Sequence, residues 1–235
     1  MSNGGEGKDT KGDAMNKHMT RIWAVCALAV AVTGCGGKPQ VKYQASDRNA
    51  AAGQSEEWNF DKDQTGGLPV GAEVFAGVWQ IRAEGDAPTP PNVLCQTGTA
   101  DFPAIRLGEK LYADLVATAR FKPISGKDDQ AAGIIFRVQD ANNYYILRAN
   151  ALEDNIIFFR YASGSRSEIK EGSAKVVSGQ WQELKLEVEG NHFRGYLDGK
   201  LVVEATEDAY KAGGVGLWTK ADSVTCFDDF RVTGR

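Results

Sequence analysis

The feature that most constrains the fold is a succession of short runs of β-forming residues, which starts at Trp58 and continues to the C-terminus. Three of these runs are residues 133–138 (GIIFRV), 144–149 (YYILRA) and 156–161 (IIFFRY). The runs recur at intervals of roughly 8–12 residues with turn residues between them, a pattern typical of β-sandwiches. No long window has the spacing of an amphipathic helix. The pattern predicts an all-β sandwich of two antiparallel sheets, arranged as a jelly roll.

One hairpin can be placed within this succession. The β-forming runs at residues 192–197 and 201–205 are joined by a turn that contains Asp198-Gly199. Asp-Gly suits a two-residue type I′ turn, because both of its central residues must adopt positive φ angles. A helical turn is expected at residues 65–70 or 208–211 at most.

At the N-terminus, Lys17 and Arg21 precede an apolar stretch over residues 22–32. Such a stretch is too short to cross a hydrocarbon core, which needs about 20 residues, and is typical of a signal peptide. It leads through Thr-Gly to Cys35, and this sequence resembles the lipobox of bacterial lipoproteins. The resemblance implies that residues 1–34 are removed and that acyl chains such as palmitate on Cys35 form a stable membrane anchor. The alternatives are a plain secretory signal and a buried helix with a chance cysteine.

The same reasoning divides the chain into segments. Residues 1–14 carry glycines and acids that a signal peptide does not need, so Met15 is the expected start of translation. Residues 35–56 offer little to bury and are expected to form a flexible tether, followed by the jelly-roll domain over residues 57–235. Because Gly36 rather than Asp follows the lipidated cysteine, we expect the outer membrane, facing the periplasm or the cell surface.

The charge balance bears on the partner. The chain has 27 Lys and Arg against 31 Asp and Glu. Removing residues 1–34, which hold four of the former and three of the latter, leaves 23 basic and 28 acidic side chains and a net charge of −5. A mildly acidic domain without a stripe of Lys and Arg argues against nucleic acid as a partner. The expected partners are the membrane, through the anchor, and a saccharide or glycan.

Two cysteines, Cys95 and Cys226, belong to the predicted domain. In an oxidising compartment they can form a disulfide. Each also lies in an apolar run, where a lone buried cysteine is ordinary. Both alternatives remain open from the sequence.

Several segments together resemble a known group of domains: residues 132–155, Trp181, residues 196–201 (YLDGKL) and residues 214–225 (GVGLWTKADSVT). They resemble the concanavalin A-like lectin/glucanase jelly rolls, in particular the laminin-G-like domains of the 3-keto-disaccharide hydrolase family. The resemblance runs from about residue 57 to the end and implies a jelly-roll fold. That fold hosts lectins, glycosidases and adhesion modules. The Glu-x-Asp-x-x-Glu signature of the family 16 glycoside hydrolases is absent, which argues against an ordinary retaining glucanase.

Strand alternation brings polar residues to one predicted sheet face. If Phe136 and Leu147 face the core, then Arg137 and Arg148, which follow them, face the other way. Arg160 follows Phe159 and is expected on the same outer side. An aromatic platform with planar hydrogen-bonding groups is what sugar binding requires, so we expect a saccharide site on the concave face. Its candidate residues are Arg137, Arg148, Asn150, Glu153, Trp218, Lys220 and Asp222. The alternative is a solvated sheet face with Trp218 buried in the core.

Catalysis is a weaker expectation. Glycoside hydrolysis usually needs two carboxylates across a cleft, and Glu153 is the best candidate, although it can equally be a turn former. The other acids in this half of the chain are Asp140, Asp154, Asp222, Asp228 and Asp229. His192 is the one histidine of the domain and is expected at a strand end on the surface. A calcium site using Asp140 and Asn142 would be incomplete, so no metal and no cofactor are predicted.

Three functions follow as expectations. The first is a lipid-anchored envelope protein that binds a saccharide without acting on it. The second is a glycoside hydrolase of the 3-keto-disaccharide type. The third is a protein-interaction module without a sugar ligand.

Overall fold

The structure, a computed structural model, describes residues 51–235. The predicted signal peptide, the predicted lipidation site at Cys35 and the predicted tether up to residue 50 lie outside the described residues. Within residues 51–235 all regular structure is β-strand, in two antiparallel sheets. The described residues include no helix long and apolar enough to span a membrane.

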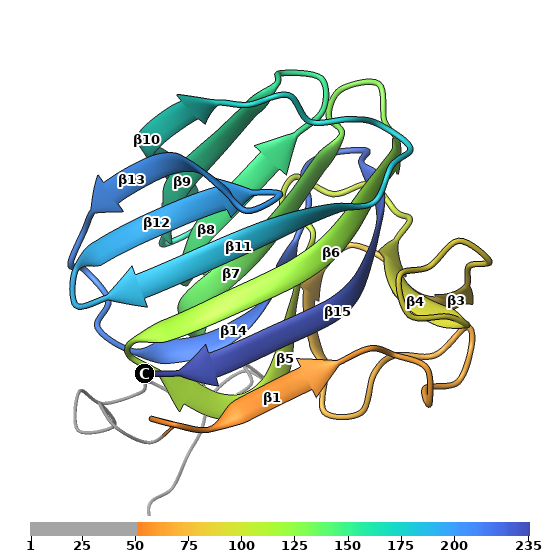
Figure 1. The fold of residues 1–235 in the computed structure, drawn as a ribbon, viewed down its shortest axis with the longest axis horizontal. Coiled ribbons are helices and arrows are strands. Elements are labelled where there is room, and N and C mark those ends of the chain that lie inside the picture. Colours follow the sequence, from red (N-terminus) through yellow and green to blue (C-terminus); the bar gives the residue numbers. More distant parts are fainter. Residues whose placement is uncertain (1–50) are drawn as a thin grey trace, which may run out of the picture. The chain divides into compact units, whose positions relative to one another are not determined.

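The first sheet contains eight strands (Figure 1). Their order is β13-β12-β11-β6-β15-β4-β3, and β1 pairs with β15 beyond the end of β4. The strands are β1 (Ser55–Trp58), β3 (Trp79–Ala83), β4 (Asn92–Gln96), β6 (Leu115–Ser125), β11 (Gln182–Glu189), β12 (His192–Leu197), β13 (Lys200–Thr206) and β15 (Val224–Gly234).

The second sheet contains seven strands in the order β10-β9-β8-β7-β14-β5-β2 and lies behind the first in Figure 1. The strands are β2 (Glu73–Ala76), β5 (Ala104–Tyr112), β7 (Ala131–Asp140), β8 (Asn143–Asn150), β9 (Asn155–Ala162), β10 (Ser165–Ser173) and β14 (Gly213–Trp218). The predicted all-β jelly-roll sandwich is confirmed.

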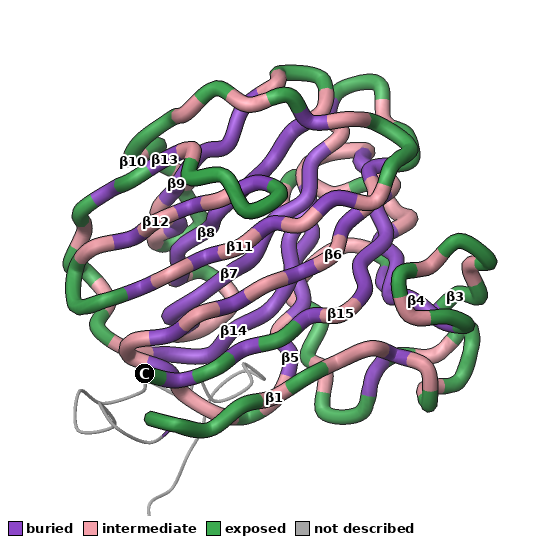
Figure 2. Tube along the Cα trace, in the orientation of Figure 1, coloured by how far each residue is buried: buried purple, intermediate pink, exposed green. Residues whose placement is uncertain are grey.

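The two sheets differ in how their outer faces are covered (Figure 2). In β6 and β11 buried residues alternate with partly exposed ones, so the first sheet buries one face and presents the other to solvent. In β7, β8 and β14 nearly every residue is buried. Continuous apolar runs such as Gly-Ile-Ile-Phe are typical of strands covered on both faces. The second sheet therefore has a covered outer face as well.

The main core lies between the sheets and is rich in aromatic side chains. Phe193 of β12 contacts Phe136, Tyr145 and Phe158 of the second sheet, with ring centroids 5.0, 5.1 and 5.8 Å away. Aromatic pairs of this kind each contribute roughly 0.5–1.5 kcal/mol beyond the area that they bury. The cluster fixes β12 against the middle of the second sheet.

The N-terminal boundary of the sandwich corrects the predicted tether. Residues 51–56 pack on the domain, because Ser55–Trp58 pairs with β15 and Ala52 forms a bridge with Gly234. Ala51 is buried. The sequence prediction failed here because the strand has only four residues, and its Ser-Glu-Glu-Trp sequence is polar.

The predicted hairpin is present between β12 and β13. Leu197 pairs with Lys200, and the two residues between them, Asp198 and Gly199, have φ angles of 47° and 78°. Two positive φ angles define the expected type I′ turn. Residues 65–70 and 208–211 contain no helix.

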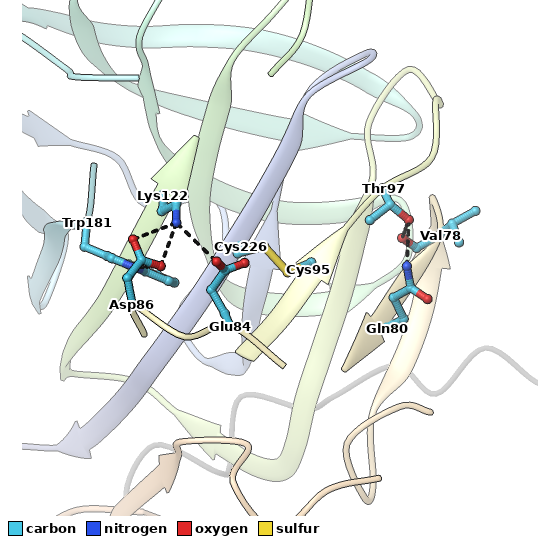
Figure 3. The surroundings of a disulfide bond; sticks show 9 residues. All are labelled: Val78, Gln80, Glu84, Asp86, Cys95, Thr97, Lys122, Trp181 and Cys226. Carbon is cyan, nitrogen blue, oxygen red and sulfur yellow. Dashed lines mark hydrogen bonds and ion pairs between the residues drawn. A yellow bond between two sulfur atoms is a disulfide. The ribbon is translucent and has the colours of Figure 1, made fainter. Parts of the chain in front are cut away.

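The structure joins Cys95 and Cys226 in a disulfide between directly opposed residues of β4 and β15 (Figure 3). Both cysteines are fully buried, with Val93 beside them and Trp181 and Ala87 packed against them. Asp86, in the segment after β3, accepts hydrogen bonds from Lys122 Nζ at 2.8 and 2.9 Å. This contact holds the segment against the outer face of the first sheet, over the disulfide.

Candidate functional site

The candidate site lies on the outer face of the second sheet. In β8 and β9, Leu147 and Phe158 belong to the main core, whereas Ile146, Ile157 and Phe159 belong to a separate apolar cluster of the second sheet. Because side chains alternate along a strand, the separate cluster marks the outer face. One row of cross-strand neighbours there runs Ile157, Arg148, Gly133, Trp218 and Ala104.

Gly133 separates Arg148 from Trp218 in this row. A Cβ atom at Gly133 would lie 3.0 Å from the backbone oxygen of Leu147 and 3.4 Å from Cβ of Trp218. A side chain at position 133 would therefore be crowded against the neighbouring strands β8 and β14.

Arg148 is the centre of the polar groups on this face. Its side chain is only 2% exposed, and its Nη2 donates to Glu153 Oε2 at 2.7 Å and to Asn155 Oδ1 at 2.6 Å. Its Nε is buried and has no hydrogen-bond partner among residues 51–235. An unpaired buried donor costs roughly 1–3 kcal/mol, so Arg148 occupies this position at some cost to stability.

Glu153 remains ionised in this setting. Burial raises the pKa of its carboxyl, but hydrogen bonds and charge from Arg148, with a hydrogen bond from Asn155, outweigh burial and lower the pKa below its usual value. The side chain is half exposed. Glu153 can therefore accept hydrogen bonds or a proton, and it is poorly suited to donate a proton at neutral pH.

Arg166 of β10 packs on an aromatic cluster. Its guanidinium carbon lies 4.3 Å from the ring centre of Phe159, 5.3 Å from that of Phe102 and 5.7 Å from that of Trp218. Phe102 stacks on Trp218 at 6.2 Å. Trp218 is fully buried, so the predicted exposed platform is wrong for this residue, and only Phe102 of these rings is partly exposed. Burial and the nearby charge of Arg148 lower the pKa of Arg166. Its Nη1 is also buried without a partner in the described part of the chain.

A second carboxylate, Asp129, lies close enough to Arg148 for their charges to interact. Asn150 Nδ2 donates to Asp129 Oδ1 at 2.7 Å, and burial raises the pKa of this carboxyl, although the charges of Lys220 and Arg148 oppose the shift. Lys220 Nζ lies 5.1 Å from the ring centre of Phe102. We call the polar residues of this face the Arg148 cluster: Asp129, Arg148, Glu153, Asn155, Arg166 and Lys220.

Asp222 and Asn150 were predicted to bind the ligand, but in the structure both side chains bond to backbone groups of loops. The Asp222 carboxylate accepts hydrogen bonds from the backbone N–H groups of residues 127, 128 and 129, at 2.6–3.1 Å for the shortest contact of each. These bonds lower its pKa. The Asn150 amide oxygen accepts from the N–H of Leu152. Both side chains therefore support the loops around the Arg148 cluster.

Arg137 is not part of the site. Its guanidinium donates to the backbone oxygens of Ala113, Tyr210 and Gly190 and lies 5.4 Å from the ring centre of Phe193, in the main core. The pairing of β7 with β8 shifts register after Phe136, and Arg137 has a φ of 48°. A β-bulge redirects side chains, and this one turns Arg137 inward.

Arg160 also lies on the wrong side for the predicted site. It pairs across the strands with the core residue Tyr145, and its side chain contacts Glu207 at 3.5 Å. Phe158, rather than Phe159, faces the main core, so the parity assumed from the sequence was shifted by one residue in β9.

The remaining candidates have structural roles elsewhere. Asp140 Oδ1 accepts from the Asn142 N–H and from Asn143 Nδ2, as a turn former does. Asp154 pairs with Lys175 at 2.8 Å. Asp228 and Asp229 accept hydrogen bonds from Thr89. His192 begins β12 and lies 3.6 Å from Glu204. Residues 51–235 contain no group of three or more His, Cys, Asp or Glu placed to hold a metal ion.

Two hollows elsewhere on the domain are not lined by residues of the Arg148 cluster. One of about 330 Å³ is lined by Ile169, Lys170, His192, Glu204, Ala205 and Thr206. The other, of about 580 Å³, is lined by Glu56, Glu57, Trp58, Val70, Gly71, Gly108, Glu109 and Lys110. Neither contains any of the buried, unpaired donors of the Arg148 cluster. We therefore base the candidate site on the cluster rather than on these hollows.

Four residues of the site were missed by sequence reasoning: Phe102, Asp129, Asn155 and Arg166. Phe102 and Asp129 lie in loops, where strand alternation gives no signal. Arg166 lies in β10, whose polar sequence Ser-Arg-Ser-Glu-Ile-Lys-Glu-Gly-Ser does not read as a strand. The arrangement as a whole supplies guanidinium donors, carboxylate acceptors and the partly exposed ring of Phe102 on one face.

Comparison with known proteins decides the family. The chain matches the family described as the 3-keto-alpha-glucoside-1,2-lyase-like domain over residues 47–233. The chain belongs to this family. The family assignment agrees with the resemblance found in the sequence.

The chain is similar to levanase in sequence, and its fold is similar to that of two solved proteins. Levanase of Bacillus subtilis (strain 168) is 28% identical over 142 residues, which cover 60% of this chain and 20% of levanase. The chain thus spans about a fifth of that protein's length. The carbohydrate-binding module CBM66 from Bacillus subtilis shares 24% identity with a TM-score of 0.58, over 68% of this chain and 94% of the module. The β-glucanase of Bacillus licheniformis shares 14% identity with a TM-score of 0.50, over 77% and 98%. Both solved structures share the fold of this chain.

Proposed function

We propose that this family domain binds a saccharide at the Arg148 cluster. The observation that carries the proposal is the half-exposed carboxylate of Glu153, which lies within electrostatic reach of the partly exposed Arg166. A sugar hydroxyl can donate to Glu153 and accept from Arg166 in the same contact. The partly exposed ring of Phe102 lies 5.3 Å from the Arg166 guanidinium carbon and supplies an apolar surface beside these groups, as ligand sites commonly do.

Levan is the first ligand to test, because levanase is named for it and is similar to this chain over 142 residues. The similarity to a whole carbohydrate-binding module supports binding as the function. A titration of the protein with levan, followed by a panel of other glycans, tests the proposal. Saturable binding to at least one glycan supports it. An absence of binding across the panel would favour the protein-interaction module instead.

A catalytic role is the second candidate, and the family name and two carboxylates favour it. The pKa of Glu153 is lowered by Arg148, whereas burial raises that of Asp129. Opposite shifts in neighbouring carboxyls are typical of acid–base pairs. Under this proposal Glu153 would act as the base on a 3-keto-α-glucoside. Glu153→Gln should then abolish turnover of that substrate while binding survives, and a wild-type protein without turnover would exclude the role.

We further propose that the protein works at the cell envelope, held by acyl chains on Cys35. The support is the sequence Val-Thr-Gly-Cys after a short apolar stretch. Cys35→Ser should abolish labelling by a clickable fatty acid and leave the precursor uncleaved. Equal labelling of mutant and wild type would refute the anchor.

A further inference from the structure

Gln96, the last residue of β4, is a fully buried polar side chain beside the candidate site. Its neighbour Cys95 belongs to the cluster on the outer face of the first sheet, and Leu94 belongs to the main core. Alternation along the strand turns Gln96 to the same side as Leu94, toward the second sheet. A buried amide needs partners, and those of Gln96 come from two loops.

The Gln96 amide joins these two loops. Its Nε2 lies 2.8 Å from the backbone oxygen of Gly98, 3.2 Å from Thr219 Oγ1 and 2.9 Å from the backbone oxygen of Ser223. Its Oε1 accepts from the N–H of Gly98. Gln96 therefore links the loop that follows β4 with the loop that follows β14.

Both loops carry residues of the candidate site. The loop after β4 contains Phe102, and the loop after β14 contains Lys220. The loops also contact each other directly, through hydrogen bonds from the N–H of Ala100 to Ala221 and from the N–H of Thr219 to Pro103. Gln96 lies at the base of this pair of loops, where one side chain can set their separation.

The disulfide restrains the strand that carries Gln96. Cys95 is bonded to Cys226, and β15 continues directly from the Lys220 loop. One end of the covalent link is adjacent to Gln96, and the other is three residues after Ser223. The position of the amide relative to both loops is therefore restrained by a covalent bond as well as by hydrogen bonds.

We infer that Gln96 is a positioning residue for the saccharide site: it holds Phe102 and Lys220 in place without touching the ligand. The effect of Gln96 on binding rests on the proposed function, whereas its effect on the two loops does not. Gln96→Met keeps the side-chain volume but leaves Thr219 Oγ1, the Ser223 oxygen and the Gly98 N–H without this partner. Loop opening should become easier, since buried groups that lose a partner destabilise the closed state.

The test compares Gln96→Met with Gln182→Met in the full chain. Gln182 is also a buried glutamine, and its amide bonds the Val177 N–H and Asp198 far from these loops. Amide hydrogen exchange at residues 98–102 and 219–223 should be about tenfold faster or more in Gln96→Met and unchanged in Gln182→Met. Levan affinity should fall by a similar factor only in Gln96→Met.

Each outcome is decisive for the inference. A folded Gln96→Met protein with wild-type exchange in both loops overturns it. If Gln96→Met does not fold, Thr219→Val removes one partner of the amide and should show the same faster exchange at residues 219–223, and wild-type exchange in that variant overturns the inference. If the wild-type protein does not bind levan, that choice of ligand fails, and loop exchange alone decides the role of Gln96.

Discussion

Arg148 and Arg166 lie against the same aromatic ring. Their guanidinium carbons are 5.4 and 4.3 Å from the ring centre of Phe159. Cation–π contacts contribute roughly 0.5–2 kcal/mol each, but two like charges at one ring also repel, and this repulsion helps to lower the pKa of Arg166. Each arginine retains a buried nitrogen without a partner among residues 51–235. A ligand oxygen bound to another donor of the partly exposed Arg166 would be stabilised by the charges of both arginines.

Arg148→Ala should weaken saccharide binding by about 1.5–3 kcal/mol, the range for a hydrogen bond to a charged group. It should also lower the free energy of unfolding, because Asn155 loses its buried partner. Binding measured by calorimetry and thermal melting measured on the same sample separate the two effects. A folded variant that binds as tightly as wild type would remove Arg148 from the site.

The buried Asp228 predicts a pH dependence of stability. Burial, with repulsion from Asp229, raises its pKa to about 6 in the folded protein, against 3.8 for an unperturbed Asp. The folded state therefore binds this proton more tightly, and the stabilisation, on the order of 3 kcal/mol, is present below pH 4 and is lost as the pH rises through about 6.

Denaturant unfolding of wild type and Asp228→Asn between pH 4 and pH 8 measures this contribution. The difference in unfolding free energy between the two proteins should shift in favour of Asp228→Asn as the pH rises, because the amide does not ionise. A difference that stays constant across this range would show that Asp228 titrates normally. The comparison cancels the contributions of the other carboxyls.

Because of the disulfide, we expect Cys95 and Cys226 to show no free thiol until the protein is reduced. It joins residues 131 apart, and closing so long a loop stabilises by up to roughly 4–5 kcal/mol on the chain-entropy model. Thiol titration of the oxidised, unfolded protein tests the bond, and two reactive thiols from these residues would refute it.

The segment after β3 should control access to this bond. Lys122→Met removes the hydrogen bonds to Asp86 that hold the segment over the disulfide (Figure 3). Reduction by dithiothreitol under native conditions should become faster, since opening the segment becomes easier. The matched control is Lys185→Met on the same sheet, which pairs with Glu187 away from the disulfide. Equal reduction rates in all three proteins would contradict this role.

The strands could be read from the sequence because apolar runs and turn residues are local signals. The hairpin at Asp198-Gly199 and the polar outer position of Arg148 followed from the same rules. Arg137 could not be placed, because a bulge in β7 reverses its direction, and a bulge leaves no mark in an alternating pattern. Arg166 could not be found, because a polar edge strand without alternation resembles a loop. Each of these positions depends on pairing between strands, which sequence spacing does not encode.

The central claim is that the outer face of the second sheet binds a saccharide, and Arg166 tests it most directly. Arg166 is partly exposed, forms no ion pair within 4.0 Å among residues 51–235 and has a buried nitrogen without a partner, so Arg166→Met should fold normally. Isothermal titration of levan into wild type, Arg166→Met and the exposed control Arg82→Met gives the three affinities. We predict binding by wild type and Arg82→Met and a loss of about 1.5–3 kcal/mol in Arg166→Met. Equal affinity for levan in all three proteins would contradict the account.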